Sequence, residues 1–160
     1  MRIRKNPRAL EFVCQHPDIV IFRPQEYKGK WREYFEKHCG NKPDASLKIE
    51  IGMGKGKFIT ESAMLNKTDD FIGIDLRPEI MMSALKKVLE HDIGNVLLVP
   101  LNAANIEDAF APGEVDTLYL NFSDPWPKAR HAKRRLTHSL FLERYKKILK
   151  KGSEIILKTD

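Results

Sequence analysis

Five short apolar segments, each ending at or just before a glycine, an acid or an amide, set the strongest limit on how this chain can fold. Between them lie segments whose apolar residues recur at the three- and four-residue spacing of an amphipathic helix. Strands that alternate with helices form a parallel sheet, because each helix returns the chain to the end where the next strand begins. The sequence therefore predicts an α/β fold with a doubly wound, mostly parallel sheet. The predicted strands are residues 47–52, 71–76, 95–100, 115–122 and 153–160.

The helices expected between the strands have recognisable ends. Pro78 suits the first turn of the second helix, whose apolar face includes Leu89. In the last helix Thr137 is the expected N-cap, Leu140 faces the core and Gly152 ends the helix. The predicted helices are residues 57–67, 78–92, 105–110 and 136–152.

Positive charge is concentrated in two stretches that hold no acid. Residues 1–46 are expected to form an N-terminal extension that packs, through a helix within 25–39, on a core of residues 47–160. The two stretches carry +9 against a total of +6, so the rest of the chain has a net charge of −3. Clustered cations favour binding to a polyanion, because each phosphate contact releases counterions. The cations are Arg2, Arg4, Lys5 and Arg8 in the first stretch, and Lys128, Arg130, Lys133, Arg134 and Arg135 in the second.

Several classes of protein are disfavoured. No apolar run approaches the roughly 18 residues of a membrane span, and none of signal-peptide length follows the charged start. Cys14 and Cys39 lack a partner at metal-ligand spacing, so free thiols in a reducing compartment are expected. We expect a cytoplasmic protein with no membrane partner and no metal; the sequence does not indicate an oligomeric state.

The first predicted strand runs into a glycine-rich turn, E-I-G-M-G-K-G, at residues 50–56. Gly52 and Gly54 let the backbone approach a ligand closely, and the following helix presents free N–H groups. A dinucleotide fingerprint would place its third glycine at 57, where Lys57 stands. Glu50 instead suits a ligand with a positive amino group, such as S-adenosyl-L-methionine.

The next two strand ends complete an expected adenosine pocket. Asp75 follows the glycines by about twenty residues, where an acid commonly accepts the hydroxyls of a ribose. Asn102 can hydrogen-bond an adenine edge, and Ala103 leaves room for the ring.

The fourth strand end opens the segment N-F-S-D-P-W-P-K-A-R-H-A-K-R-R-L-T-H, residues 121–138. Its two prolines favour extended backbone at Asp124 and Trp126, so Asp124 is expected to have a fixed position, as a reacting group requires. Trp126 either stacks on a base or packs as a wedge that holds Asp124. Lys128 and Arg130 can reach phosphates beside a base held there.

Motifs along essentially the whole chain resemble those of bacterial tRNA (guanine-N7-)-methyltransferases, the TrmB family. The resemblance implies a Rossmann-like class I fold and methyl transfer from S-adenosyl-L-methionine to N7 of guanosine 46 in the variable loop of tRNA. Family members continue beyond the T-D that ends this sequence, into two further strands and a T-x-x-E motif. A sheet that ends here is expected to leave one edge uncovered. The motifs, in order, are E-I-G-M-G-K-G, G-I-D, L-N-A, N-F-S-D-P-W-P-K-A-R-H-A-K-R-R-L-T and L-K-T-D.

The resemblance also implies a role for each matching residue. Asp124 would be catalytic, Lys128 and Asp160 would touch the substrate, and no residue would bind a metal. The cofactor contacts would be Glu50, Gly52, Gly54, Asp75, Asn102, Ala103 and Asp124. The RNA contacts would be Arg130, His131, Lys133, Arg134 and Arg135.

Two other functions remain open from the residues. D-P-W is related to the D/N-P-P-aromatic signature of methyltransferases that act on exocyclic amines, although Trp126 replaces the second proline. The same fold can also serve as a non-catalytic RNA-binding module. His131 and His138 are expected to face RNA or solvent, because no acid or cysteine joins them at ligand spacing.

Overall fold

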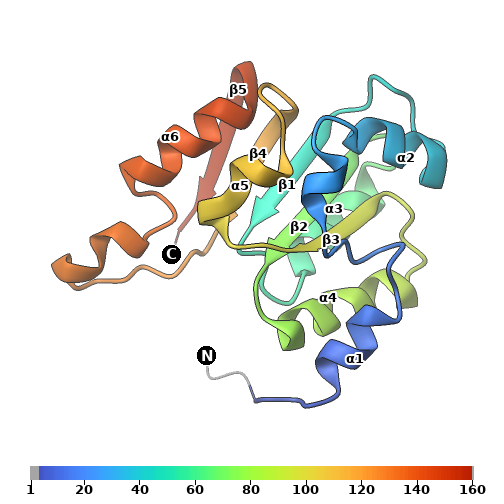
Figure 1. Ribbon diagram of the computed structural model, residues 1–160, viewed down its shortest axis with the longest axis horizontal. Coiled ribbons are helices and arrows are strands. Elements are labelled where there is room, and N and C mark those ends of the chain that lie inside the picture. Colours follow the sequence, from blue (N-terminus) through green and yellow to red (C-terminus); the bar gives the residue numbers. More distant parts are fainter. Residues whose placement is uncertain (1–3, 160) are drawn as a thin grey trace.

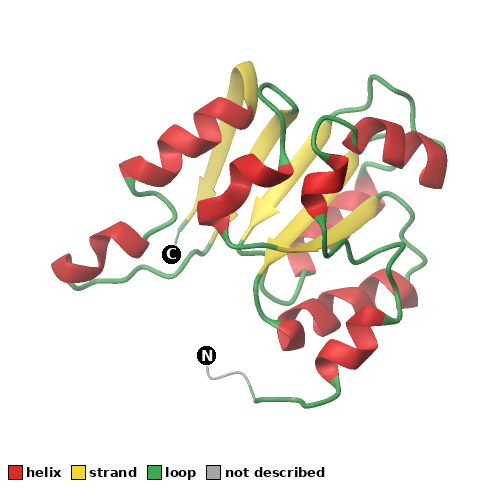
Figure 2. Cartoon of the chain, in the orientation of Figure 1, coloured by secondary structure: helices red, strands yellow, loops and turns green. Residues whose placement is uncertain are grey.

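The computed structural model describes residues 4–159, and its centre is a single five-stranded sheet (Figures 1 and 2). The strands lie in the order β3-β2-β1-β4-β5, and all four neighbouring pairs are parallel. The predicted doubly wound α/β architecture is confirmed. The strands are β1 (Leu47–Ile51), β2 (Asp70–Asp75), β3 (Val96–Pro100), β4 (Val115–Asn121) and β5 (Leu149–Lys158).

Helices cover both faces of the sheet, as Figure 2 shows. On one face α3 and α4 bury a cluster that includes Ile59, Leu85 and Leu98. On the other face Trp31 and Tyr145, from α2 and α6, belong to a second cluster. The α-helices are α1 (Ala9–Cys14), α2 (Trp31–Cys39), α3 (Lys57–Leu65), α4 (Pro78–Glu90), α5 (Ile106–Ala109) and α6 (Ser139–Ile148). The 3₁₀ helices are η1 (Pro24–Tyr27), η2 (Ala103–Asn105) and η3 (Ala129–Arg134).

The N-terminal segment wraps around the β3 edge of the sheet. Helix α1 packs against α4 on one face, and Val20 then forms an isolated parallel bridge with Leu98 of β3. On the opposite face the fully buried Trp31 donates its indole N–H to the Ala109 carbonyl over 2.8 Å. The Glu114 carboxylate accepts the Trp31 backbone N–H at 3.3 Å, so this segment is fixed to the core by polar and apolar contacts.

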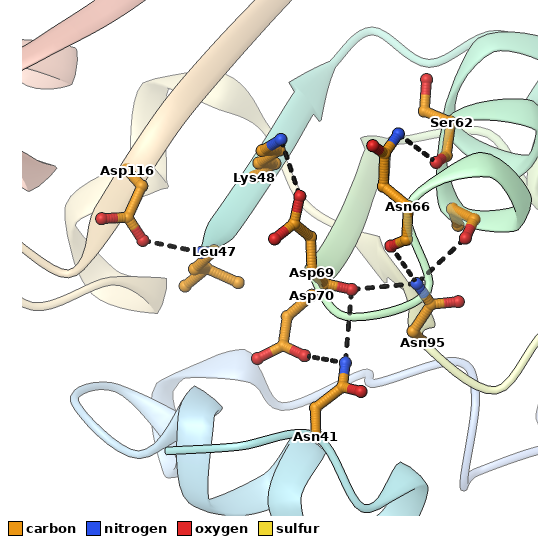
Figure 3. A network of polar contacts seen from close by, with 10 residues as sticks. Asn41, Leu47, Lys48, Ser62, Asn66, Asp69, Asp70, Asn95 and Asp116 are labelled. Carbon is orange, nitrogen blue, oxygen red and sulfur yellow. Dashed lines mark hydrogen bonds and ion pairs between the residues drawn. The ribbon is translucent and has the colours of Figure 1, made fainter. Parts of the chain in front are cut away.

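The amino-terminal ends of the strands are joined by a network of polar contacts (Figure 3). Asp116 accepts the Leu47 backbone N–H over 2.7 Å and so links β4 to β1. The buried Asn95 donates to three carbonyl oxygens, those of Ala63, Asn66 and Asp69. Because buried amides are costly when unpaired, these bonds stabilise the end of the sheet where ligands are not expected.

The last helix and strand depart from the sequence prediction. Helix α6 ends at Ile148, and β5 begins at Leu149 and continues through Gly152, which was predicted to end the helix. The reason is tertiary: Leu149 pairs with Val115 across an irregular register, a pairing that local sequence does not reveal. The imidazole of His138, rather than Thr137, caps α6 by accepting the Leu140 N–H at 3.2 Å.

Two predicted core residues are largely exposed. The exposed fractions of Leu89 and Leu140 are 40% and 58%. Leu89 lies in the last turn of α4 and Leu140 in the first turn of α6. Strand β5 forms an edge of the sheet, with β4 as its one neighbour among the described residues and no fully buried side chain.

Gly56 provides a test of helix packing. Its φ is +76°, and a Cβ built there would lie 2.6 Å from the Ala84 Cβ of α4. Gly56→Ala adds backbone strain to overpacking, so we expect it to lower the free energy of unfolding by about 2 to 4 kcal/mol in urea titrations. The control is Gly113→Ala, where φ is +69° and no atom lies within 4 Å of the added carbon. It should cost only about 1 kcal/mol; equal losses would contradict the packing account.

Candidate functional site

Parallel pairing brings the predicted site residues to one edge of the sheet. In the register, Ile51 lies opposite Ile74, and Asp75 lies opposite Pro100, so β1, β2 and β3 end side by side. Strand β4 pairs with the other side of β1. The segments that follow these strands therefore lie together at the carboxyl-terminal ends of the strands, which we call the carboxyl edge. The glycine turn lies there between Asp75 and the start of the 121–138 segment.

The glycine turn has three left-handed residues with different surroundings. The N–H of Gly52 donates to the Ile74 carbonyl over 2.8 Å, which holds the turn against β2. At Gly54, with φ +56°, an added Cβ would meet no atom within 4 Å, whereas Gly56 is pressed against α4. The open space thus lies at Gly54, where a ligand can approach the backbone closely.

Asp75 is fixed by the backbone around it. One carboxylate oxygen accepts the Gly54 N–H at 3.2 Å, and the other accepts the Leu76 N–H at 2.8 Å. The oxygen that binds Leu76 also accepts the Arg77 N–H at 3.5 Å. The oxygen that binds Gly54 keeps a second lone pair, so the carboxylate can still accept a hydroxyl group. Leu76 is 57% exposed and places an apolar side chain next to this acid.

Asn102 begins the short helix η2 after β3. Its side-chain oxygen accepts the Ala104 N–H at 2.9 Å, which fixes the orientation of the exposed amide. The neighbouring Ala103 is 8% exposed, and its small side chain leaves space beside the amide. The amide nitrogen is the group of Asn102 that suits an adenine acceptor.

The carboxyl ends of β1 and β4 hold unsatisfied polar groups. Among the described residues, five buried side-chain N or O atoms lack a hydrogen-bond partner, and three of them lie here: Glu50 Oε2, Asn121 Oδ1 and Ser123 Oγ. Asn121 donates to the other Glu50 oxygen over 3.0 Å. Buried acceptors without partners are costly, so this pair is suited to a ligand that brings N–H donors and positive charge.

The surroundings of Glu50 raise its pKa to about 7. Burial is the main cause, because it disfavours the charged form. The hydrogen bond from Asn121 acts in the opposite direction. Near neutral pH the carboxyl group is therefore partly protonated, and a cation beside it would favour the ionised form.

The loop after β4 has an unusual backbone. Phe122 and Trp126 both have positive φ values, +50° and +41°. The prediction of extended backbone at Trp126 is therefore wrong, because its φ lies in the left-handed region. A bulky residue in this region costs about 1 to 3 kcal/mol and is retained only where surrounding contacts hold it. Asp124 lies in this loop with its side chain exposed.

Contacts within the 121–138 segment surround Trp126. Both Nε and Nη2 of Arg135 donate to the Trp126 carbonyl, over 3.2 and 3.0 Å. The Arg134 guanidinium lies 5.1 Å from the ring centroid, and the His131 ring meets it edge-on at 5.5 Å. The ring is in neither core cluster, which argues against the alternative in which Trp126 packs in the core; stacking on a base stays a prediction.

The predicted RNA and substrate contacts differ in exposure. Arg135 and His131 are partly buried. Asp160 lies outside the described residues. The exposed members are Lys128, Arg130, Lys133 and Arg134.

Three residues of this edge were not singled out by the sequence interpretation. Asn121 could have been suspected as the last polar residue of a predicted strand, and Leu76 as the neighbour of the strand-ending acid. Leu136 had no signal, because its contact is tertiary: it lies 3.5 Å from where a Cβ on Gly52 would be. Through Leu136 the basic segment packs against the glycine turn.

Within residues 4–159, no group of three or more His, Cys, Asp or Glu side chains is placed to hold a metal ion. The same part of the chain has no helix that is long and apolar enough to cross a membrane.

The donor and acceptor groups of this edge fit S-adenosyl-L-methionine. Glu50 and Asn121 offer unpartnered acceptors for its ammonium group, Asp75 offers a carboxylate for its ribose, and Gly54 leaves space for close approach. The parallel sheet and this site together define a Rossmann-like methyltransferase.

Comparison with known proteins narrows this class. Residues 44–160 match the family model described as putative methyltransferase. The chain is 49% identical over 160 residues to the tRNA (guanine-N(7)-)-methyltransferase of Geobacillus sp. (strain WCH70), covering all of this chain and 70% of that protein. It is 46% identical to the enzyme of the same name from Bacillus subtilis (strain 168), over 72% of its length. The chain belongs to the tRNA (guanine-N(7)-)-methyltransferase family.

Solved structures agree with the fold. The antibiotic-resistance methyltransferase Kmr is 25% identical with a TM-score of 0.59, covering 80% of this chain and 66% of that one. A SAM-dependent methyltransferase from Aquifex aeolicus has a TM-score of 0.57 at 16% identity, over 96% of this chain and 72% of that one, and shows the fold alone. The predictions of a methyltransferase enzyme and of its cofactor are confirmed.

The raised pKa of Glu50 predicts how cofactor binding depends on pH. A cationic ligand binds the ionised carboxylate, so binding below the pKa of about 7 must first remove a proton. The affinity for S-adenosyl-L-methionine, measured by calorimetry, should therefore rise on the order of tenfold between pH 6 and pH 7.5.

Glu50→Gln is the matched control, because it keeps the shape without the titration. Glu50→Gln should bind the cofactor more weakly, and its affinity should not change between pH 6 and pH 7.5. An equal pH dependence in the two proteins would exclude Glu50 as the cause.

The stability of the ligand-free protein should fall over the pH range in which cofactor affinity rises. The contribution of Glu50 is full below its ordinary value of 4.5 and is lost as pH rises through about 7. Glu50→Gln should therefore stabilise the ligand-free protein at pH 8, by up to about 3 kcal/mol.

Proposed function

We propose that this protein transfers a methyl group from S-adenosyl-L-methionine to N7 of guanosine 46 in the variable loop of tRNA. The observation that carries the proposal is the unpartnered acceptor pair of Glu50 and Asn121 at the edge where the Asp124 loop and the exposed cations follow β4. Relatives that are 46–49% identical over the whole chain are named for methylation of guanine N7 in tRNA, which supports this substrate; the choice of guanosine 46 rests on the resemblance of the motifs.

Each part of the cofactor has a counterpart at the edge. Glu50 and Asn121 hold the ammonium group, and Asp75 accepts the ribose hydroxyls. The Asn102 amide nitrogen meets the adenine edge, with Ala103 and the exposed Leu76 against its ring. When bound, the cofactor supplies a methyl group activated by a sulfonium. Because Gly52 and Gly54 have no side chain, the cofactor can approach their backbone closely.

The chemistry at guanine needs positioning more than proton transfer. N7 carries a lone pair and no proton at neutral pH, so no general base is required to make the nucleophile. Asp124 accepts hydrogen bonds from guanine N1–H and the amino group, and its negative charge stabilises the positive charge that grows on the ring. Lys128, with Asp160, contacts the same nucleotide.

The exposed cations after Lys128 bind the tRNA backbone. Arg130, Lys133 and Arg134 extend from a short helix that begins just after the Asp124 loop. Phosphate contacts of this kind fix the register of the RNA without reading sequence. A tRNA substrate in turn places the protein in the cytoplasm.

Chemical cleavage of the product tests the proposal against methylation of an exocyclic amine. Borohydride followed by aniline cuts RNA at N7-methylguanosine and leaves exocyclic methylamines intact. We expect a single cut at guanosine 46 after incubation of tRNA with the protein and cofactor. Methyl incorporation without a cut would favour the exocyclic reaction, and absence of cofactor binding would favour a non-catalytic RNA-binding module.

Asp124→Asn tests the role of the carboxylate. The variant keeps the shape but loses the charge, so kcat should fall by about 30- to 1,000-fold, equivalent to about 2 to 4 kcal/mol. The affinity for S-adenosyl-L-methionine, measured separately by calorimetry, should change far less. Equal turnover of the two proteins would remove Asp124 from the mechanism.

The salt dependence of tRNA binding tests the cationic surface. Four to five phosphate contacts predict a slope of log K against log salt of about −3 to −4. Arg130→Gln should weaken tRNA binding and reduce the size of this slope by about 1. A slope near zero for the unchanged protein would rule out the segment as an RNA contact.

A further inference from the structure

Arg135 differs from the other cations of its segment in what its guanidinium contacts. Lys128, Arg130 and Lys133 are exposed, whereas Arg135 is partly buried and directs two N–H groups at one carbonyl oxygen, that of Trp126. The sequence shows five similar cations within residues 128–135; the structure separates one of them. A guanidinium that donates twice to a loop carbonyl is less available to a phosphate than an exposed one.

The carbonyl that Arg135 holds belongs to Trp126, one of the two residues of the loop with positive φ. Trp126 has φ +41°, a conformation that an L-residue with a bulky side chain keeps only where its surroundings fix it. Arg135 fixes the backbone of Trp126, while Arg134 and His131 contact its ring. These contacts close a loop from residue 126 to residue 135, and Asp124 lies two positions before the fixed residue.

The residue that follows Arg135 in the chain contacts the glycine turn. This residue, Leu136, packs on the core and lies against Gly52 of the glycine turn. The same short stretch therefore touches the turn that meets the cofactor and holds the loop that carries Asp124.

We propose that Arg135 is a positioning residue, which sets the Asp124 loop relative to the glycine turn through its double hydrogen bond to Trp126. Contact with tRNA phosphates is then left to Lys128, Arg130, Lys133 and the outer face of Arg134. This inference rests on the proposed function for the role of Asp124, but the clamp itself can be measured without methyl transfer.

Acrylamide quenching of tryptophan fluorescence reports the clamp directly. The chain has two tryptophans, and Trp31 is fully buried, so the quenchable signal comes from Trp126. Trp126→Phe should remove that signal and so verify the assignment. Arg135→Gln should increase the quenching slope, because a released loop exposes the ring. Arg135→Lys can donate to the carbonyl but without the planar fork, and should fall between the two.

Activity and RNA binding distinguish positioning from direct contact. Displacement of Asp124 by about 1 Å should lower kcat by up to about 100-fold in Arg135→Gln. Its tRNA affinity and salt slope should stay close to those of the unchanged protein. Arg130→Gln, the matched control, should do the reverse: the salt slope falls by about 1, while Trp126 quenching does not change.

Two results would overturn the proposal. In one, Arg135→Gln lowers the salt slope by about 1 with unchanged quenching, which would make Arg135 an RNA contact. In the other, quenching and kcat both remain unchanged, which would mean that Arg135 holds nothing. If Arg135→Gln does not fold, Arg135→Lys decides by quenching and kcat alone, because lysine keeps the positive charge and leaves the salt slope unchanged in either case. Unchanged quenching and kcat in Arg135→Lys would then overturn the proposal. If the protein transfers no methyl group at all, the proposed function fails, and quenching still reports on the clamp.

Discussion

The parallel pairing of β1 with β2 on one side and β4 on the other is the constraint on which the rest of this molecule depends. It forces the strands to end at one edge, so residues separated by more than seventy positions, such as Glu50 and Asn121, meet there and share a hydrogen bond. No local rule would bring them together. The glycine turn, Asp75 and the Asp124 loop lie at this end of the sheet for the same reason.

The amino-terminal and carboxyl-terminal ends of the strands differ in how many of their buried polar groups have hydrogen-bond partners. At the amino-terminal edge, Asn95 and Asp116 bind backbone groups of neighbouring segments and fasten the chain (Figure 3). At the carboxyl-terminal ends of the strands, three buried polar atoms of the described residues lack partners, those of Glu50, Asn121 and Ser123, against one, Asp70 Oδ2, at the amino-terminal ends. The second arrangement costs stability in the ligand-free protein, and it provides acceptors that a cationic cofactor can use. The contacts that fasten the chain thus lie mainly at the amino-terminal ends of the strands, and the acceptors available to a ligand lie at their carboxyl-terminal ends.

Most of the architecture could be predicted from the sequence, because alternating strand and helix patterns allow few topologies. The strand ends followed from the same pattern, and so did the positions of Glu50, Asp75 and Asn102 along one edge. What could not be predicted depends on tertiary contacts. The left-handed backbone at Trp126 is held by Arg135 from nine residues away. Strand β5 begins early because Leu149 pairs with Val115. Identical charges in a row gave no indication that Arg135 faces inward.

The central claim is methyl transfer to guanine N7, and the most direct measurement of it is mass spectrometry of tRNA nucleosides. Unmodified tRNA would be incubated with the protein and S-adenosyl-L-methionine carrying an isotopically labelled methyl group. The account predicts labelled N7-methylguanosine and no other labelled nucleoside. Label on an exocyclic amine, or no label although the cofactor binds, would contradict it.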